Sequence, residues 1–240
     1  MPCLELDFSR VRAVTFDAGG TLLTPDPGVG EVYAEILARF DVALAPALLN
    51  RRFRAAFKEL TTARPRPVVN EDTERAFWRE VVRRCISPEC PENLVAKVFA
   101  ELWEEFADAR RWRALPGVEE ALGALSARKH LRLAVLSNWD SRLHRVLAGF
   151  GWARPFERAF ISSEIGAEKP DARAFRAVEA ALGLPASACL HVGDSVAHDY
   201  HAAQLAGWQA ILVNPSPPTG NSVLHQISSL AQLPALLPKS

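Results

Sequence analysis

Five short apolar runs, the last four of them alternating with helical stretches, limit the fold of this chain more than any other feature. The runs lie at roughly residues 11–17, 131–138, 158–162, 188–193 and 209–213, and amphipathic helical segments lie at 117–129, 141–150, 171–183 and 196–206. Strands that alternate with helices form βαβ units, whose right-handed crossovers build a parallel sheet covered by helices on both faces. The sequence therefore predicts a doubly wound α/β core.

Residues 28–112 carry a different pattern, in which helical periodicity replaces the strand signal. Residues 64–67, with the sequence Arg-Pro-Arg-Pro, interrupt the pattern and predict a loop between helices. We expect a helical domain over 28–112, inserted into a core made of residues 1–27 and 113–240. Proline and glycine at both junctions are typical of hinges, so the insert is a candidate lid, although a fixed helical layer would show the same pattern.

Composition argues against several classes of partner. The 240 residues contain 28 basic and 28 acidic side chains, so no net field attracts nucleic acid or an anionic membrane surface. The N-terminus lacks the pattern of a signal peptide, and no segment approaches the roughly 18 apolar residues of a membrane span. We expect a cytoplasmic protein whose cysteines, Cys3, Cys85, Cys90 and Cys189, are reduced because they form no CxxC pair. The sequence does not indicate an oligomeric state.

Polar side chains stand where the predicted strands end. Asp17 closes the first apolar run and precedes Gly19 and Gly20, and the other polar groups follow later runs or turns. Because the carboxyl ends of parallel strands share one edge of a sheet, where ligands bind, we expect these groups to converge in one crevice. The set comprises Asp17, Ser137, Asn138, Lys169, Asp194 and Asp199.

Two carboxylates in one crevice imply a cation. Asp17 and Asp194 would repel each other and raise each other's pKa unless positive charge lay between them. Hard oxygen ligands favour Mg²⁺, and Lys169 would supply the remaining positive charge.

The ordered segments resemble the haloacid dehalogenase superfamily of hydrolases, with the helical insert in the position of a type 1 cap on a Rossmann-like core. The run at 137–143, Ser-Asn-Trp-Asp-Ser-Arg-Leu, further suggests the subgroup that contains haloacid dehalogenase-like hydrolase domain-containing protein three and its rhythmically expressed relatives.

This resemblance implies a role for each residue of the set. Asp17 would be the nucleophile, and its carboxylate, that of Asp194 and the main-chain carbonyl of Gly19 would bind Mg²⁺. Ser137 and Lys169 would hold the phosphoryl group, with further hydrogen bonds from Asn138 and from backbone amides after Asp17, including Gly20. Asp199 would orient Lys169 or a water on the metal.

Gly19 departs from the phosphatases of this superfamily, which usually carry a second aspartate at that position as the general acid and base. Its carbonyl can still bind a metal, but glycine has no proton to transfer. General acid–base catalysis is typically worth about 10²–10⁴-fold, so we expect weak turnover or a requirement for good leaving groups such as acyl phosphates. Asp140 would replace the missing acid only if its loop pointed inward.

Together these features predict a Mg²⁺-dependent hydrolase of small phosphorylated metabolites that acts through an aspartyl-phosphate on Asp17. The alternative suggested by Gly19 is a catalytically weakened protein that binds phosphate or a partner. A 2-haloacid dehalogenase is a further alternative, against which the retained Gly193-Asp194 pair argues, because that reaction uses no metal. His191, inside the fourth apolar run, is interpreted as a core or interface histidine.

Overall fold

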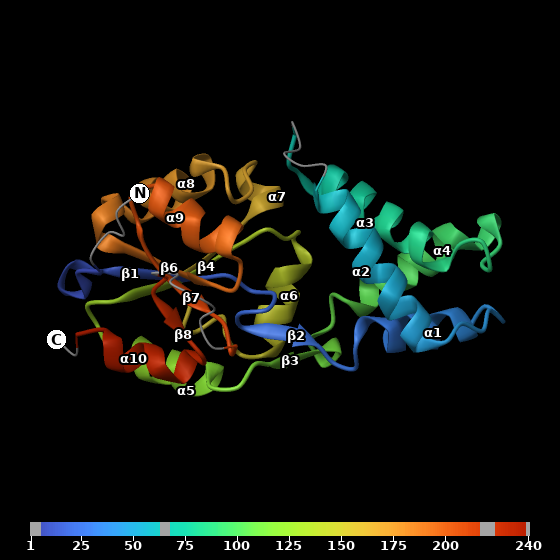
Figure 1. The fold of residues 1–240 in the computed structure, drawn as a ribbon, viewed down its shortest axis with the longest axis horizontal. Helices are drawn as coiled ribbons and strands as arrows, with labels where there is room; N and C mark the ends of the chain where they lie inside the picture. Colours follow the sequence, from blue (N-terminus) through green and yellow to red (C-terminus); the bar gives the residue numbers. More distant parts are fainter. Residues whose placement is uncertain (1–5, 63–67, 217–223, 239–240) are drawn as a thin grey trace. The chain divides into compact units, whose positions relative to one another are not determined.

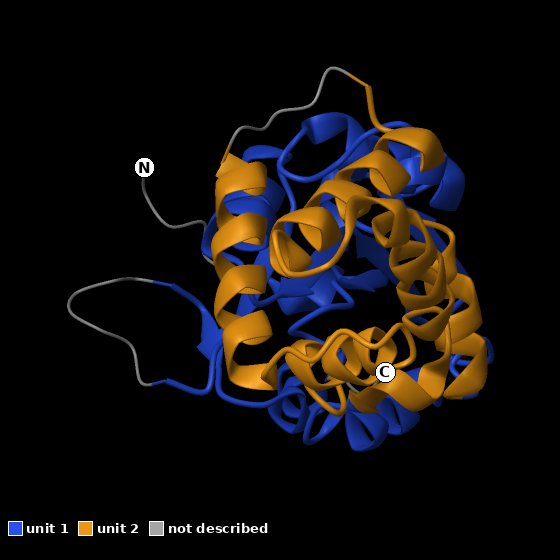
Figure 2. Ribbon diagram, turned by 90° about the vertical axis from the view of Figure 1, so that its right-hand side faces the viewer, with its two compact units in different colours: residues 1–24, 114–139, 151–240 blue, residues 25–113, 140–150 orange. Residues whose placement is uncertain are grey.

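The computed structural model describes residues 6–62, 68–216 and 224–238. The chain forms two compact units, coloured separately in Figure 2. Unit 1 contains residues 1–24, 114–139 and 151–240, and unit 2 contains residues 25–113 and 140–150. Cys3 and the loop expected at 64–67 lie outside the described residues.

Unit 1 is built on a six-stranded parallel sheet (Figure 1). Its strands are β1 (Ala13–Phe16), β4 (Arg132–Ser137), β5 (Arg158–Ile161), β6 (Cys189–Gly193), β7 (Gln209–Val213) and β8 (Gln226–Ile227). They pair in parallel in the order β5-β4-β1-β6-β7-β8. Every residue of the central strands β1 and β6 is buried, as a sheet covered on both faces requires. The predicted α/β core is therefore confirmed, while β8, only two residues long, has no sequence pattern to reveal it.

Helices cover both faces of this sheet, with α8 (Ala172–Leu182) and α9 (Ala202–Leu205) on one side and α5 (Val118–Ser126) and α10 (Leu233–Leu236) on the other (Figure 1). A short helix, α7 (Ser162–Ile165), follows β5. The helix expected at 196–206 is divided, because a wider π-helical turn, Val196–His201, precedes α9. In that turn the amides of Asp199 and Tyr200 both donate to the carbonyl of Ser195.

Unit 2 consists of the expected helices, with one addition. They are α1 (Val29–Ala38), α2 (Pro46–Thr62), α3 (Glu71–Ile86) and α4 (Glu92–Glu105), and their apolar faces form one buried cluster. A capping box at Asn70 and Thr73 begins α3, where the side chain of each residue accepts a hydrogen bond from the backbone amide of the other. Between the two units the chain runs through a two-stranded ribbon, β2 (Leu23–Pro25) and β3 (Trp112–Ala114), whose three-residue strands have no periodicity to predict them.

The addition is α6 (Arg142–Gly149), which the sequence leaves in the core and which belongs to unit 2. The guanidinium of Arg142 stacks on the ring of Trp103 in α4, 3.6 Å from its centroid, and donates to the carbonyl of Trp103. The amide of Ser141 donates to the carboxylate of Glu71. These contacts join residues far apart in sequence, so local patterns cannot predict them.

Among the helices of the described residues, none combines the length and the apolarity needed to cross a membrane.

A substitution of Phe175 tests how far packing in the core of unit 1 stabilises the fold. This side chain is fully buried on α8 and meets the ring of Trp208 edge to face, with centroids 5.3 Å apart. We expect Phe175→Ala to lower the free energy of unfolding by about 3–5 kcal/mol, because it removes apolar contacts and leaves a cavity. Urea denaturation followed by circular dichroism measures the change. Leu205→Ala is the control, because Leu205 is 71% exposed, and equal losses in the two variants would contradict the assignment of the core.

Candidate active site

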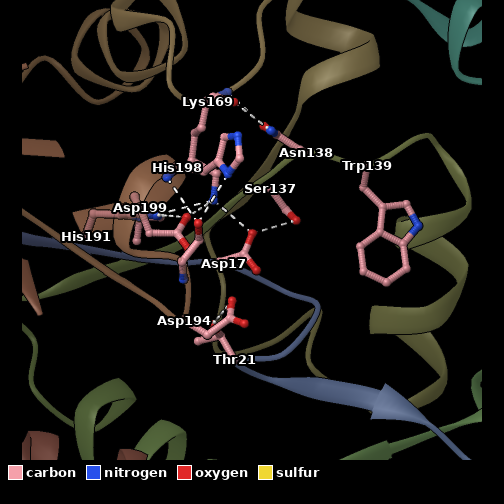
Figure 3. A network of polar contacts seen from close by, with 12 residues as sticks. Asp17, Thr21, Ser137, Asn138, Trp139, Lys169, His191, Asp194, His198 and Asp199 are labelled. Carbon is pink, nitrogen blue, oxygen red and sulfur yellow. Dashed lines mark hydrogen bonds and ion pairs between the residues drawn. The ribbon is translucent and has the colours of Figure 1, made fainter. Parts of the chain in front are cut away.

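The carboxyl edge of the sheet brings the predicted residues together (Figure 3). Phe16 of β1 lies in register with Val135 of β4 and Val192 of β6, so Asp17 follows at the level where these neighbouring strands end. Ser137 is the last residue of β4, and Asp194 is the first residue after β6. Parallel pairing thus converts residues separated by more than 100 positions into neighbours.

Lys169 is the hub of the polar network. Its Nζ donates to Oδ1 of Asp17 at 2.8 Å and to Oδ1 of Asp199 at 2.5 Å, and all three side chains are buried. Burial alone would lower the pKa of Lys169, but the two carboxylates raise it above its ordinary value. Lys169 is therefore held as an ammonium ion.

Asp17 uses one carboxylate oxygen for two hydrogen bonds. Its Oδ1 accepts from Lys169 and, at 3.0 Å, from the hydroxyl of Ser137. Among the described residues, none donates a hydrogen bond to its Oδ2. Burial raises the pKa of Asp17 above its ordinary value, the charge of Lys169 opposes this effect, and Asp199 adds to it. The second oxygen remains available for a cation or for attack on a substrate.

Asn138 fastens the backbone of Lys169. Its Nδ2 donates to the carbonyl of Lys169, and its Oδ1 accepts from the amide of Lys169, both at 2.8 Å. Both ends of this side chain are thus engaged in positioning the lysine. The contact expected between Asn138 and a phosphoryl group stays a prediction.

Asp199 is saturated with hydrogen bonds. Its Oδ1 accepts from Lys169 and lies 3.1 Å from Nε2 of His191, while its Oδ2 accepts from the amide of Ser195 at 2.8 Å. Burial alone would raise the pKa of Asp199, but the charge of Lys169 and the hydrogen bond from His191 lower it below its usual range. Asp199 is a carboxylate whose Oδ1 orients Lys169 and whose Oδ2 is held by the backbone of Ser195.

Asp194 is the exposed member of the acidic set, and Gly20 makes room for it. Gly20 has φ +83°, and a Cβ there would lie 2.5 Å from Oδ2 of Asp194, so only glycine fits. The protein around Asp194 displaces hydration from its carboxylate, and this effect, followed by the charges of Asp17 and Asp199, raises the pKa of Asp194 to about 7. Among the described residues, no basic side chain forms an ion pair with Asp194, and the charge of Lys169 acts on it only from a distance.

The three aspartates fit a cation. Asp17, Asp194 and Asp199 each present a carboxylate oxygen, and these oxygens lie within 4.8 Å of one another. With the single ammonium of Lys169 they leave two net negative charges, and hard oxygen donors suit a hard divalent ion. Gly19 lies in the turn after Asp17, bridged to Leu23, and its carbonyl stays a predicted ligand.

His191 and Thr15 belong to the network, although sequence reasoning assigned His191 to the core or an interface. His191 is buried, as expected for a core residue, but its Nδ1 lies 2.8 Å from the hydroxyl of Thr15 and its Nε2 lies 3.3 Å from Nζ of Lys169. Burial and the charge of Lys169 lower the pKa of His191, which favours the neutral ring. Strand alternation could have revealed that His191 lies near the site. Side chains two residues apart, such as Thr15 and Asp17, point to the same face of the sheet, and Thr15 is the register partner of His191.

Asp140 does not provide a free acid. Its carboxylate is fully buried within unit 2 and accepts hydrogen bonds from Nε and Nη2 of Arg142, both at 2.7 Å. A bidentate pair of this kind keeps both oxygens of the carboxylate engaged.

Comparisons with known proteins identify the family of this chain. Residues 11–207 match the model of a hydrolase family described as haloacid dehalogenase-like hydrolase. The chain belongs to this family of hydrolases.

Two relatives point to the subgroup that the sequence suggested. Haloacid dehalogenase-like hydrolase domain-containing protein 3 of Mus musculus is 32% identical over 233 residues, which cover 95% of this chain and 91% of the mouse protein. The Rhythmically expressed gene 2 protein of Drosophila melanogaster is 30% identical over 222 residues, covering 86% of this chain and 84% of that protein.

Solved structures share the fold at lower identity. The putative HAD-hydrolase YfnB of Bacillus subtilis, bound to magnesium, superposes with a TM-score of 0.69 at 18% identity, covering 95% of this chain and 99% of that chain. The defluorinating L-2-haloacid dehalogenase Rha0230 has a TM-score of 0.76 at 20% identity, covering 95% of each chain. At these identities the likeness shows the fold alone.

The raised pKa of Asp194 predicts a stabilising substitution in metal-free protein. Because this pKa is about 7 in the folded state against an ordinary 3.8, the charged carboxylate destabilises the folded state most above pH 7, and the penalty vanishes toward pH 4. In EDTA at pH 8 we expect Asp194→Asn to raise the melting temperature by about 2–4 °C, the effect of roughly 1 kcal/mol in a chain of this size. The gain should shrink as the pH is lowered.

Asp41→Asn is the matched control, because Asp41 is an exposed acid whose φ of 59° asparagine also tolerates. Differential scanning fluorimetry over this pH range gives the comparison. An Asp194→Asn variant that is less stable than the wild type at pH 8 would show that Asp194 has a stabilising partner.

Proposed function

We propose that this hydrolase acts on small phosphorylated metabolites, requires Mg²⁺, and uses Asp17 as its nucleophile. The observation that carries the proposal is the charge arrangement at the sheet edge. One buried ammonium, Lys169, bridges Asp17 and Asp199, while the carboxylates still leave two negative charges unpaired. A divalent cation would compensate that excess, and together with Lys169 it would create the positive field that a phosphoryl group needs.

The residues divide the chemistry of phosphoryl transfer among them. A carboxylate oxygen of Asp17 attacks phosphorus, and the bond from phosphorus to the leaving oxygen breaks, with its electron pair remaining on that oxygen. Water then attacks the phosphorus of the aspartyl-phosphate, which releases phosphate and restores the carboxylate. Mg²⁺, held by Asp17, Asp194 and the carbonyl of Gly19, would supply charge neutralisation at the phosphoryl oxygens.

Lys169 and Ser137 serve this transfer through hydrogen bonds to the same oxygen of Asp17. Lys169 favours the charged form of the carboxylate, against the effect of burial on the pKa of Asp17, and lies 2.8 Å from Oδ1, near enough to donate to a phosphoryl oxygen as well. The hydroxyl of Ser137, which donates to the same Oδ1, can turn to a phosphoryl oxygen without moving its backbone. Asn138, Asp199 and His191 act through Lys169 as positioning residues.

Gly19 limits the substrates. Without an acid at this position the leaving oxygen receives no proton from residue 19, so the site favours substrates whose leaving group is a stable anion. Acyl phosphates, which release a carboxylate, meet this condition.

Two other functions remain as outcomes of the test. A phosphate-binding protein with the same site would bind but not turn over, in keeping with Gly19. A dehalogenase, as Rha0230 is, would displace halide from carbon, a reaction in keeping with the absence of a proton donor at residue 19. The acidic set argues against it, because that reaction needs no cation. The magnesium bound to YfnB supports Mg²⁺ as the ion.

Phosphate release from acetyl phosphate tests the proposal. We expect the wild type to release phosphate with Mg²⁺ and not in EDTA, and Asp17→Asn to release none. An alkyl phosphate should turn over about 10²–10⁴-fold more slowly than acetyl phosphate, because its leaving group needs a proton. After rapid acid quenching, mass spectrometry should find one phosphoryl group on the peptide that contains Asp17.

Asp41→Asn again serves as the control and should behave as the wild type. Mg²⁺-dependent binding of phosphate without turnover of any ester or anhydride would instead support the phosphate-binding protein. Halide release from L-2-chloropropionate that persists in EDTA would support the dehalogenase. Either result would overturn the proposed function.

A further inference from the structure

The ring of Trp139 covers the side of Gly19 on which a side chain would stand. A Cβ built on Gly19 would lie 3.3 Å from Cζ3 of Trp139, closer than ordinary van der Waals contact. Apart from the chain neighbours of Gly19, this ring atom is the only heavy atom of the described residues within 4 Å of that Cβ. The backbone of Gly19 is not in the left-handed region, so the ring, and not the main chain, disfavours a larger residue here.

The backbone of Trp139 is fixed. Its amide donates to Oγ of Ser162 at 3.0 Å, and its carbonyl accepts from the same hydroxyl at 3.0 Å and from the amide of Ser163 at 3.2 Å. The preceding residue, Asn138, is fastened to Lys169 by the two hydrogen bonds described above. Figure 3 shows Trp139 beside this network, on the same loop as Asn138. The indole can therefore leave Gly19 only by rotation of its own side chain.

We propose that Trp139 is a specificity-determining residue, whose indole occupies the space that an acidic side chain at position 19 would need. This inference rests on the proposed function. The ring replaces a proton donor with an apolar wall two residues beyond the nucleophile. Gly19 and Trp139 form a pair, in which the tryptophan ring would have to shift to admit any larger residue at position 19.

The pair selects substrates by the charge of the departing group. When the bond from phosphorus to the leaving oxygen breaks, the electron pair stays on that oxygen and residue 19 supplies no proton. A carboxylate leaving from an acyl phosphate is stable as an anion. An alkoxide leaving from an alkyl phosphate is not, so such esters are rejected even when they fit the site.

A double-mutant cycle tests this selection with acetyl phosphate and glycerol 3-phosphate as the probes. We expect Gly19→Asp alone to leave the hydrolysis of glycerol 3-phosphate slow, because the ring prevents the carboxyl group from taking a productive position. Gly19→Asp combined with Trp139→Ala should raise that rate by about 10²-fold or more, the usual contribution of a general acid. Trp139→Phe, which shortens the ring system and keeps an aromatic side chain, is the second background if alanine impairs folding.

The inference is overturned if Gly19→Asp gives the full gain with Trp139 in place and the second substitution adds nothing. Additive effects of this kind mean that the two positions are independent. Acetyl phosphate is the internal control, because its leaving group needs no proton and its rate should change far less than that of glycerol 3-phosphate in the double variant.

A second cycle measures the contact without any catalysis. Gly19→Ala should lower the melting temperature of the wild type but not that of Trp139→Ala, because the added methyl group then meets open space. Gly123→Ala is the matched control, since nothing lies within 4 Å of a Cβ there, in the exposed face of α5, and alanine favours the helix in both backgrounds.

Equal effects of Gly19→Ala in both backgrounds would overturn the pairing of Gly19 with Trp139. A clear coupling in melting temperature, without phosphate release by any variant, would overturn the proposed function and with it the selection of leaving groups. The two failures are therefore distinguishable.

Discussion

The buried ammonium of Lys169 is the constraint on which the rest of the site depends. A charge in the interior is tolerated only when it is paired and hydrogen-bonded, and here Asp17 and Asp199 supply the pairing. The surrounding residues serve to hold this geometry. Asn138 fixes the lysine backbone, and Gly193 lacks the Cβ that would collide with Asp199. The π-helical turn brings Asp199 back to the amide of Ser195, a use of irregular helix that is common at functional sites.

The same electrostatics explains why the site remains incomplete without a ligand. The single positive charge of Lys169 can compensate only one of the three carboxylates. Partial burial, together with the remaining negative charge of Asp17 and Asp199, raises the pKa of Asp194. A cation and a phosphoryl group would together restore balance, because the first compensates the aspartates and the second meets the cation and the ammonium. At position 19, glycine and the ring of Trp139 beside it provide no ionisable side chain. Under the proposed function, such a site would stabilise negative charge on phosphorus and would donate no proton from residue 19.

Several features were beyond local patterns. His191 lies in a continuous buried strand, where a core histidine and a network histidine look alike in sequence, and only its pairing with Thr15 and Asp199 distinguishes them. The transfer of α6 to unit 2 depends on Arg142 and Trp103, which are 39 positions apart. The two hydrogen bonds from Asn138 to the backbone of Lys169 could not be predicted, because an amide that follows Ser137 is equally suited to bind a ligand or the backbone.

By itself the sequence determined the parallel α/β core, the helical insert and the gathering of Asp17, Ser137, Lys169, Asp194 and Asp199 at one edge. It could do so because strand and helix periods are local, and because parallel strands end on one side. Only the tertiary structure decided which oxygen meets which donor, which carboxylate stays unpaired, and that an indole stands over Gly19. Those properties depend on distances of a few ångströms between residues remote in sequence, and hydration and charge at that scale set both pKa and reactivity.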